Sequence, residues 1–285
     1  MTPRRALVLA LAVGAFVIAW ALSRYAIEGS GAGASPSIAA SRAADDTPGD
    51  AEKITLRFFR NPAAAPAFTA RDLDGRSIST AALRGKVVLI NFWATWCPPC
   101  RAEIPDLVAL QEKYRDQLQV IGVSEDEGPI ETVKRFAADH HINYPVVMTT
   151  PDIERMFPGI GALPTSFVVS RDARIVQKHV GMLTRRVTEY ETRHLAGLPV
   201  NAAIEEVEQT QGLKLENGAQ LMTIPGVDLT KLPAARRAEA LQKLNSQACT
   251  CGCDLTVAKC RVDDPSCGVS LPLARQIVAQ LAGSQ

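Results

Sequence analysis

The sequence predicts an α/β domain with a mixed sheet flanked by helices, followed by a small helical domain rich in cysteine. In the first two thirds of the chain, short apolar runs alternate with amphipathic helical patterns, which is typical of parallel strands joined by helices. The last two runs of this part flank the turn Ser170–Ala173 and predict an antiparallel hairpin at the edge of the sheet. Near the C-terminus, five cysteines fall between Cys249 and Cys267.

The predicted elements follow these patterns. Strands are expected at Ala67–Thr69, Val87–Trp93, Val120–Val123, Val146–Met148, Ser166–Val169 and Ile175–Val180. Helices are expected at Pro99–Tyr114, Ile130–His140, Arg185–Leu195, Ala234–Leu244 and Leu271–Leu281. Pro105 should kink the first helix, while Pro265 and Gly268 interrupt any helix between the last cysteines. The stretch Asn201–Lys231 has no pattern that predicts an element.

Cys97 and Cys100 lie where the apolar strand Val87–Trp93 passes into a helix. The unpaired N–H groups and the positive dipole end of a helix N-terminus stabilise a thiolate. A free thiol has a pKa of about 8.5, and in such a setting values near 7 or below are common. We expect Cys97 at an exposed turn, where it attacks a disulfide, and Cys100 one turn later, where it resolves the mixed disulfide. The motif therefore predicts thiol–disulfide exchange.

Other uses of a CxxC pair fit less well. A zinc site needs a second ligand pair at a matching spacing, and none lies in this domain. Haem attachment requires a histidine after the second cysteine, and Arg101 stands there. A structural disulfide remains an alternative, but the position between strand and helix suits a reactive site better.

Three stretches of the chain resemble the TlpA/ResA group of membrane-tethered thioredoxin-like proteins. They are Gly85–Pro105, which contains Trp96-Cys97-Pro98-Pro99-Cys100, the upstream segment Ala67–Gly75 and the downstream segment Gly161–Val169. The resemblance covers about residues 59–198 and implies a thioredoxin-like fold and an extracytoplasmic thiol–disulfide reductant, several members serving cytochrome c maturation. It also implies that Cys97 and Cys100 form the redox-active disulfide, with Trp96, Pro98 and Pro99 in support. Pro164 would be the cis-proline that presents backbone groups to a bound partner segment.

The acidic residues near this motif have two interpretations. Thioredoxins carry a buried acid six positions before the first cysteine, where this chain has Asn91. The ResA-like branch instead has a glutamate three residues after the second cysteine, and Glu103 stands there, one helical turn from Cys100. Its carboxylate could tune or deprotonate a thiol, or it could be a first-turn charge that complements the helix dipole. The segment Ser124–Gly128, with Glu125 and Asp126, is expected to be a solvated loop.

Two other protein classes fit the motif poorly. A peroxidase of the peroxiredoxin type needs a proline and a hydroxyl residue seven and three positions before its cysteine, where this chain has Ile90 and Ala94. A copper chaperone related to this fold has CxxxC spacing with a downstream histidine. The direction of exchange is not set by the motif, because the same chemistry serves an oxidant or a reductant. The resemblance favours the reductant.

The N-terminal residues predict a membrane anchor. Arg4 and Arg5 precede the charge-free run Ala6–Leu22, which as a helix would span roughly 26 Å. Positive charge before the run places the following domains outside the cytoplasm, on a single-pass protein of the cytoplasmic (inner) membrane. A cleaved signal peptide is the alternative. The predicted domains are 1–23 (cytoplasmic stub and anchor), 24–53 (flexible tether), 54–198 (thioredoxin-like), 199–232 (linker) and 233–285 (cysteine-rich helical).

The C-terminal cluster of Cys249, Cys251, Cys253, Cys260 and Cys267 has three interpretations. They are a disulfide scaffold, a second redox centre that relays electrons to or from Cys97 and Cys100, and a thiolate site for zinc or Cu(I). Because five is an odd number, a scaffold would leave at least one cysteine free or paired elsewhere. Residues 242–280 also weakly resemble the cysteine-bearing helical module of a thiol-reducing partner in cytochrome c maturation. The LxCxxC signature of that family is absent, so its residue roles do not transfer.

The expected partners follow from the chemistry. A protein with a disulfide is the expected substrate, and because no nucleotide or flavin motif is visible, electrons should come from a membrane donor. A net charge of +1 argues against a nucleic acid partner. No cofactor is expected unless the C-terminal cluster binds zinc or copper.

Overall fold

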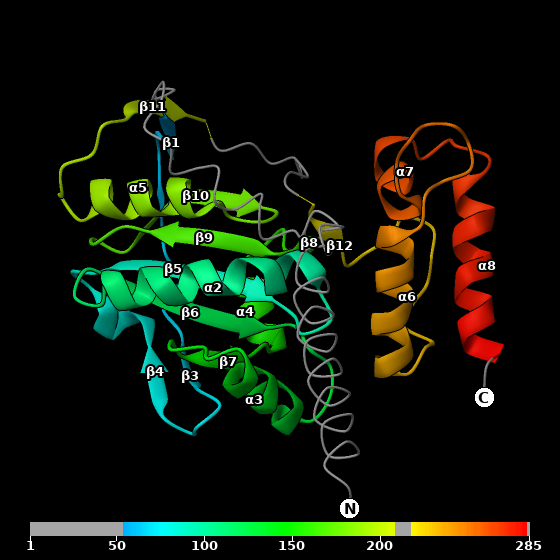
Figure 1. The fold of residues 1–285 in the computed structure, drawn as a ribbon, viewed down its shortest axis with the longest axis horizontal. Helices are drawn as coiled ribbons and strands as arrows, with labels where there is room; N and C mark the ends of the chain where they lie inside the picture. The colour runs from blue at the N-terminus through cyan, green and yellow to red at the C-terminus, as the bar shows by residue number, and fades with distance from the viewer. Residues whose placement is uncertain (1–53, 209–217, 284–285) are drawn as a thin grey trace, which may run out of the picture. The chain divides into compact units, whose positions relative to one another are not determined.

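Strand β5 (Val87–Trp93) is the centre of the fold, and each of its seven residues is buried. The computed structural model, shown in Figure 1, describes residues 54–208 and 218–283. The main sheet has the order β2-β10-β9-β5-β6-β7. Its other strands are β2 (Ala63–Ala64), β10 (Arg174–Val180), β9 (Thr165–Val169), β6 (Leu118–Ser124) and β7 (Val146–Met148). Strands β5, β6 and β7 are parallel to one another, and β9 runs antiparallel to both of its neighbours, β5 and β10. The predicted mixed sheet is therefore confirmed.

The helices that cover the sheet agree closely with the predicted ranges. They are α2 (Pro98–Lys113), α3 (Ile130–Asp139) and α5 (Arg185–Leu195). Helix α2 continues through Pro105 and buries Ile104, Leu107 and Leu110. Strands β5 and β7 and helix α5 match their predicted bounds residue for residue. Long periodic segments with a buried face are thus the part of the fold that the sequence specifies most directly.

The short elements differ from the prediction. The strand predicted at Ala67–Thr69 is wrong, because β3 (Thr69–Arg71) pairs with β4 (Ser77–Ser79) in a small hairpin beside the short helix η2 (Thr80–Leu83). Helix α4 (Pro151–Met156) has six residues and was not predicted, since so short a segment shows no helical period. These elements depend on tertiary contacts more than on local pattern.

A parallel pair extends the thioredoxin-like domain beyond Leu198. Strand β1 (Thr55–Phe59) pairs with β11 (Ala203–Val207), which lies in the stretch predicted to be a linker. Four of the five β11 residues are exposed, so the strand lacks the alternation that would have revealed it. The ion pair between Arg57 and Glu205 joins the two strands at their surface.

The C-terminal residues form a helical module with its own core. Helices α6 (Ala234–Ser246), α7 (Val257–Asp263) and α8 (Ser270–Gly283) contact one another, as Figure 1 shows. Leu241, Leu244, Val257 and Ile277 are among the buried residues between them. Before the module, β12 (Gln220–Leu221) pairs with β8 (Ala162–Leu163) of the thioredoxin-like domain. The two helices predicted here are confirmed, and α7 is added between them.

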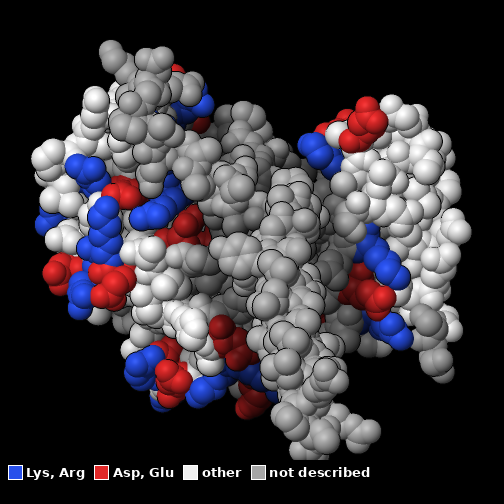
Figure 2. All heavy atoms as spheres, viewed as in Figure 1, with Lys and Arg blue, Asp and Glu red and all other residues white. Residues whose placement is uncertain are grey.

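The described surface carries charges of both signs. Figure 2 shows Lys and Arg side chains interspersed with Asp and Glu on the visible face. Arg76, for example, pairs with the exposed Asp74. Exposed pairs of this kind contribute at most about 1 kcal/mol each to stability.

Within residues 54–208 and 218–283, no helix is long and apolar enough to cross a membrane. The predicted anchor Ala6–Leu22 and the tether 24–53 lie outside the described residues.

Replacing Gly122 with Ala should destabilise the protein by about 1–3 kcal/mol, because overpacking a dense core forces its neighbours to move. A Cβ at Gly122 would lie 2.8 Å from Trp93 Nε1 and 3.2 Å from Val146 Cγ2. Urea unfolding measures the effect. The control is Gly283→Ala, where a Cβ meets nothing within 4 Å. Equal unfolding midpoints for the two variants would contradict the packing argument.

Candidate functional site

The loop after β5 delivers two cysteines to the start of α2. Cys97 is the N-cap of the helix, and its sulfur accepts a hydrogen bond from the backbone N–H of Cys100 at 3.4 Å. Pro98 and Pro99 form the first two helical positions, where a missing N–H costs no helical hydrogen bond. The sulfur atoms of Cys97 and Cys100 are joined in a disulfide. The predicted placement of the pair at a helix N-terminus is therefore correct.

Cys97 is not at an exposed turn, so that part of the prediction is wrong. The side chains of Cys97 and Cys100 are both buried, with 0% of their surface exposed. Trp96 packs against the core of the C-terminal module, and its carbonyl accepts a hydrogen bond from Gln242 Nε2 at 3.2 Å. This contact joins residues 146 positions apart, and no local pattern reveals it.

The peptide between Leu163 and Pro164 is cis, as the resemblance implies. Phe92 pairs with Thr165, so the start of β9 lies beside the end of β5. The turn at Pro164 and the loop that leads to Cys97 therefore meet at the same end of the sheet. Leu163 also pairs with Gln220 of β12, so a segment of this chain lies along the edge beside the cis-proline.

Glu103 is held inside the protein by two hydrogen-bond donors. Its carboxylate accepts from Asn91 Nδ2 at 2.7 Å and from the backbone N–H of Leu183 at 2.8 Å. Only 1% of the residue is exposed. Burial raises the pKa of Glu103 to about 8, although these two hydrogen bonds and the nearby His179 favour the charged form. The carboxyl can therefore exchange a proton near neutral pH.

These contacts decide between the two interpretations of Glu103. Helix α2 begins at Pro98, which places Glu103 in its second turn, so the interpretation as a first-turn charge that complements the helix dipole is wrong. Asn91 cannot titrate, yet it positions the acid, and it also donates to Ser166 Oγ at 2.9 Å. The sequence did not reveal that Ser166 bonds to Asn91 or that His179 lies near Glu103, because both residues come from strands far along the chain.

The segment Ser124–Gly128 is only partly solvated. Ser124 and Glu125 are buried, against the prediction, and burial raises the pKa of Glu125 to about 7. Asp126 accepts from the backbone N–H of Thr95 at 2.9 Å and from its hydroxyl at 2.5 Å. Asp126 thereby fixes the loop just before Trp96 and Cys97. The end of β6 lies beside the end of β5, which brings these residues together.

The C-terminal cysteines converge without forming a disulfide. Cys249, Cys251, Cys253, Cys260 and Cys267 are all free. The sulfur atoms of four of them, all except Cys253, lie within 4.8 Å of one another. The backbone N–H groups of Val269 and Ser270 lower the pKa of the Cys267 thiol. The cluster predicted from sequence is therefore a single site in space.

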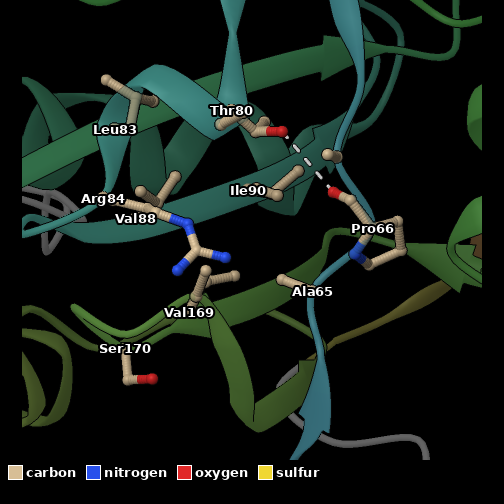
Figure 3. Close-up of a pocket in the computed structure, with 12 residues that line it drawn as sticks. Ala65, Pro66, Thr80, Leu83, Arg84, Val88, Ile90, Val169 and Ser170 are labelled. Carbon is tan, nitrogen blue, oxygen red and sulfur yellow. Dashed lines mark hydrogen bonds between the residues drawn. The ribbon is translucent and has the colours of Figure 1, made fainter.

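A cavity of about 60 Å³ lies away from both sulfur sites. Ala65, Pro66, Thr80, Val88 and Val169 are among the residues that line it, and Figure 3 shows Thr80 Oγ1 directed at the Pro66 carbonyl. Val88 pairs with Val169 near the start of β5, whereas Cys97 follows the end of that strand. The cavity is lined by no cysteine and takes no part in the chemistry considered below.

Comparison with known proteins relates the first domain of the chain to thiol–disulfide oxidoreductases. Residues 62–178 match the model of the AhpC/TSA family. The chain is 36% identical to thiol-disulfide oxidoreductase ResA of Bacillus thuringiensis over 126 residues, which are 44% of this chain and 72% of that protein. It is 34% identical to the thioredoxin-like protein YneN of Bacillus subtilis over 127 residues, 44% of this chain and 74% of YneN. A solved thiol:disulfide interchange protein from Chlorobium tepidum is 34% identical and covers 48% of this chain and 98% of its own, with a TM-score of 0.46.

A thioredoxin-like sheet, a disulfide at the N-terminus of α2 and a cis-proline at the same end define a thiol–disulfide oxidoreductase. The chain belongs to the ResA family of these enzymes. The AhpC/TSA match at residues 62–178 lies within the thioredoxin-like domain.

Replacing Glu103 with Gln should remove the loss of stability between pH 7 and 8. A carboxyl with a pKa of about 8 when folded and 4.5 when unfolded keeps its proton longer in the folded state. Stability therefore falls as pH rises from 4.5 through 8, by at most about 1.4 kcal/mol per pH unit. Urea unfolding of the oxidised protein at several pH values measures this slope.

Glu125→Gln is the matched control for this prediction. The pKa of Glu125 is raised only to about 7, so its effect ends at lower pH. The control should keep the wild-type loss of stability above pH 7. A Glu103→Gln variant with the same slope as wild type above pH 7 would contradict the assignment.

Proposed function

We propose that this chain reduces disulfides in partner proteins through the Cys97 and Cys100 dithiol. The observation that carries the proposal is the disulfide between an N-cap cysteine and a cysteine one turn later in α2. In the reduced enzyme, the Cys97 thiolate attacks one sulfur of the partner disulfide and releases the other sulfur as a thiolate. The Cys100 thiolate then attacks the Cys97 sulfur and releases the second partner thiolate. Two electrons pass to the partner, and the enzyme disulfide is formed.

Glu103 would serve this exchange as a proton acceptor for the Cys100 thiol. The two residues lie about one helical turn apart in α2, and the carboxyl has a pKa of about 8. A base is most useful when its pKa lies near the working pH. Trp96, Pro98 and Pro99 would shape the loop, and the Pro164 turn would orient the partner segment.

The setting of the reaction is also part of the proposal. Relatives of the chain are named ResA, and the TlpA/ResA group works outside the cytoplasm on a membrane anchor, several members in cytochrome c maturation. We place the catalytic domain on the extracytoplasmic side of the cytoplasmic membrane, with residues 6–22 as anchor. The dithiol would receive electrons from a membrane donor and pass them to a disulfide in a protein such as an apocytochrome.

Replacing Cys97 with Ser should abolish reduction of a protein disulfide, because the attacking thiolate is lost. Replacing Cys100 with Ser should instead leave a stable mixed disulfide between Cys97 and the substrate. The test uses the full chain, reduced anaerobically and mixed with a peptide that holds a CxxCH disulfide, with products resolved by mass spectrometry. A stable mixed disulfide on Cys100 in the Cys97→Ser protein, with none on Cys97 in the Cys100→Ser protein, would reverse the assigned roles.

The direction of exchange has a separate test. A reductant should have a potential near that of thioredoxin, about −270 mV, whereas an oxidant such as DsbA lies near −120 mV. We expect a value more negative than about −200 mV when the pair is equilibrated with glutathione buffers and the thiols are counted by alkylation. A value near −120 mV would make the chain a disulfide donor.

A further inference from the structure

The cysteines of the C-terminal module come from three separate segments and meet at one point. Cys249 and Cys251 lie in the loop after α6, Cys260 lies in α7, and Cys267 lies in the turn before α8. Their four sulfur atoms all lie within 4.8 Å of one another. Two of the four residues, Cys249 and Cys260, are buried. The site therefore lies at the junction of the helices rather than on an open surface.

The backbone of the module is folded so that these segments converge. The N–H of Cys249 donates to the Leu255 carbonyl, and the N–H of Val257 donates to the Gln247 carbonyl. These two hydrogen bonds hold the ends of the loop together. Gly252 has a φ of 87°, a left-handed conformation that favours glycine, and it turns the chain between Cys251 and Cys253. These local devices hold the two cysteines of the loop near the first turn of α7.

Two further features position the sulfurs on the other side of the site. Thr256 caps α7 by accepting from the N–H of Lys259, which sets the direction of the helix that carries Cys260. The N–H of Cys267 donates to the Asp264 carbonyl, and the Cys267 sulfur faces the N–H groups of Val269 and Ser270. Backbone donors directed at a sulfur stabilise the negative charge of a thiolate ligand.

The spacing of the sulfurs fits a tetrahedral metal ion. Zinc binds thiolates at about 2.3 Å, so two ligands of a tetrahedral site lie about 3.8 Å apart. The sulfurs of Cys251 and Cys260 are 3.9 Å apart. A disulfide would require a separation of about 2.05 Å, and none of the five cysteines forms one, although Cys97 and Cys100 do. Four soft ligands whose sulfur atoms converge within 4.8 Å of one another suit a zinc ion.

The fifth cysteine lies beside this set. Cys253 is exposed, and its sulfur is 2.9 Å from that of Cys251. A tetrahedral site accepts four ligands, so Cys253 provides an internal control for the choice of ligands. The small core of the module gives a reason for the metal, because domains of about this size are often stabilised by a metal or by disulfides.

We propose that the C-terminal module binds one Zn²⁺ as a closed structural site through the thiolates of Cys249, Cys251, Cys260 and Cys267. Binding exchanges four thiol protons for the ion and involves no electron transfer. All four coordination positions are filled by protein, so the ion holds α6, α7 and α8 together and does not activate water. The module is then independent of the redox state of Cys97 and Cys100.

The test measures the metal and the free thiols of the full chain, expressed with zinc and purified anaerobically. We expect one zinc per chain by elemental analysis, and an alkylating reagent should label Cys253 but not the four ligands. A chelator should expose all five cysteines to the reagent. Replacing zinc by Co²⁺ should give the strong visible absorption of a tetrahedral cobalt thiolate, a readout that needs no variant.

Variants assign the ligands. Cys260→Ser should lose at least nine tenths of the zinc, whereas Cys253→Ser and the double variant Cys97→Ser, Cys100→Ser should retain it. Absence of zinc from the wild-type chain, with disulfides mapped among the five cysteines, would overturn the proposal. Loss of zinc in Cys253→Ser with full retention in Cys251→Ser would overturn the assignment of Cys251.

Discussion

The structure around Cys97 and Cys100 depends on one buried carboxyl group, that of Glu103. Glu103 extends from α2 and accepts hydrogen bonds from Asn91 on β5 and from the N–H of Leu183, which precedes α5. An ionised carboxylate without such partners is costly to bury. The two donors therefore fix the register of the helix that carries the cysteines against the central strand of the sheet.

The position of Asn91 relates this arrangement to that of thioredoxins. In thioredoxins the buried acid stands at the position of Asn91, on the strand, whereas in this chain the helix provides the acid and the strand provides an amide. The carboxyl occupies the same layer between sheet and helix, since Asn91 Nδ2 and Glu103 Oε1 are only 2.7 Å apart. A buried carboxyl in this layer can thus come from either element, provided that the partner residue is a donor.

The local sequence pattern correctly predicted the elements that are long and buried. It failed for elements and contacts whose partners lie far along the chain. The run Val87–Trp93 is apolar except for Asn91, because a central strand is covered on both faces, and its limits were predicted correctly. Strand β11 is exposed along most of its length, and only its pairing with β1 makes it a strand. The same holds for the site: Cys97 and Cys100 are close in sequence, but Asn91 and Leu183 meet Glu103, and Ser166 meets Asn91, only through the sheet topology. Burial of Cys97 was mispredicted for a related reason, since the module that contacts Trp96 lies more than a hundred residues away.

The two sulfur sites of the chain show that the spacing of cysteines distinguishes thiol–disulfide exchange from metal coordination. Two residues between Cys97 and Cys100 place both sulfurs in the first turn of one helix, where they can bond to each other and leave no site for further ligands. In the C-terminal module the sulfurs come from two loops and a helix, so three separate parts of the backbone hold them. Thiol exchange requires one sulfur to move toward another, and the first arrangement allows this within a single turn. Sulfurs fixed at separate positions about 4 Å apart are instead suited to an ion between them, which is the physical basis for treating the two sites as different chemistry.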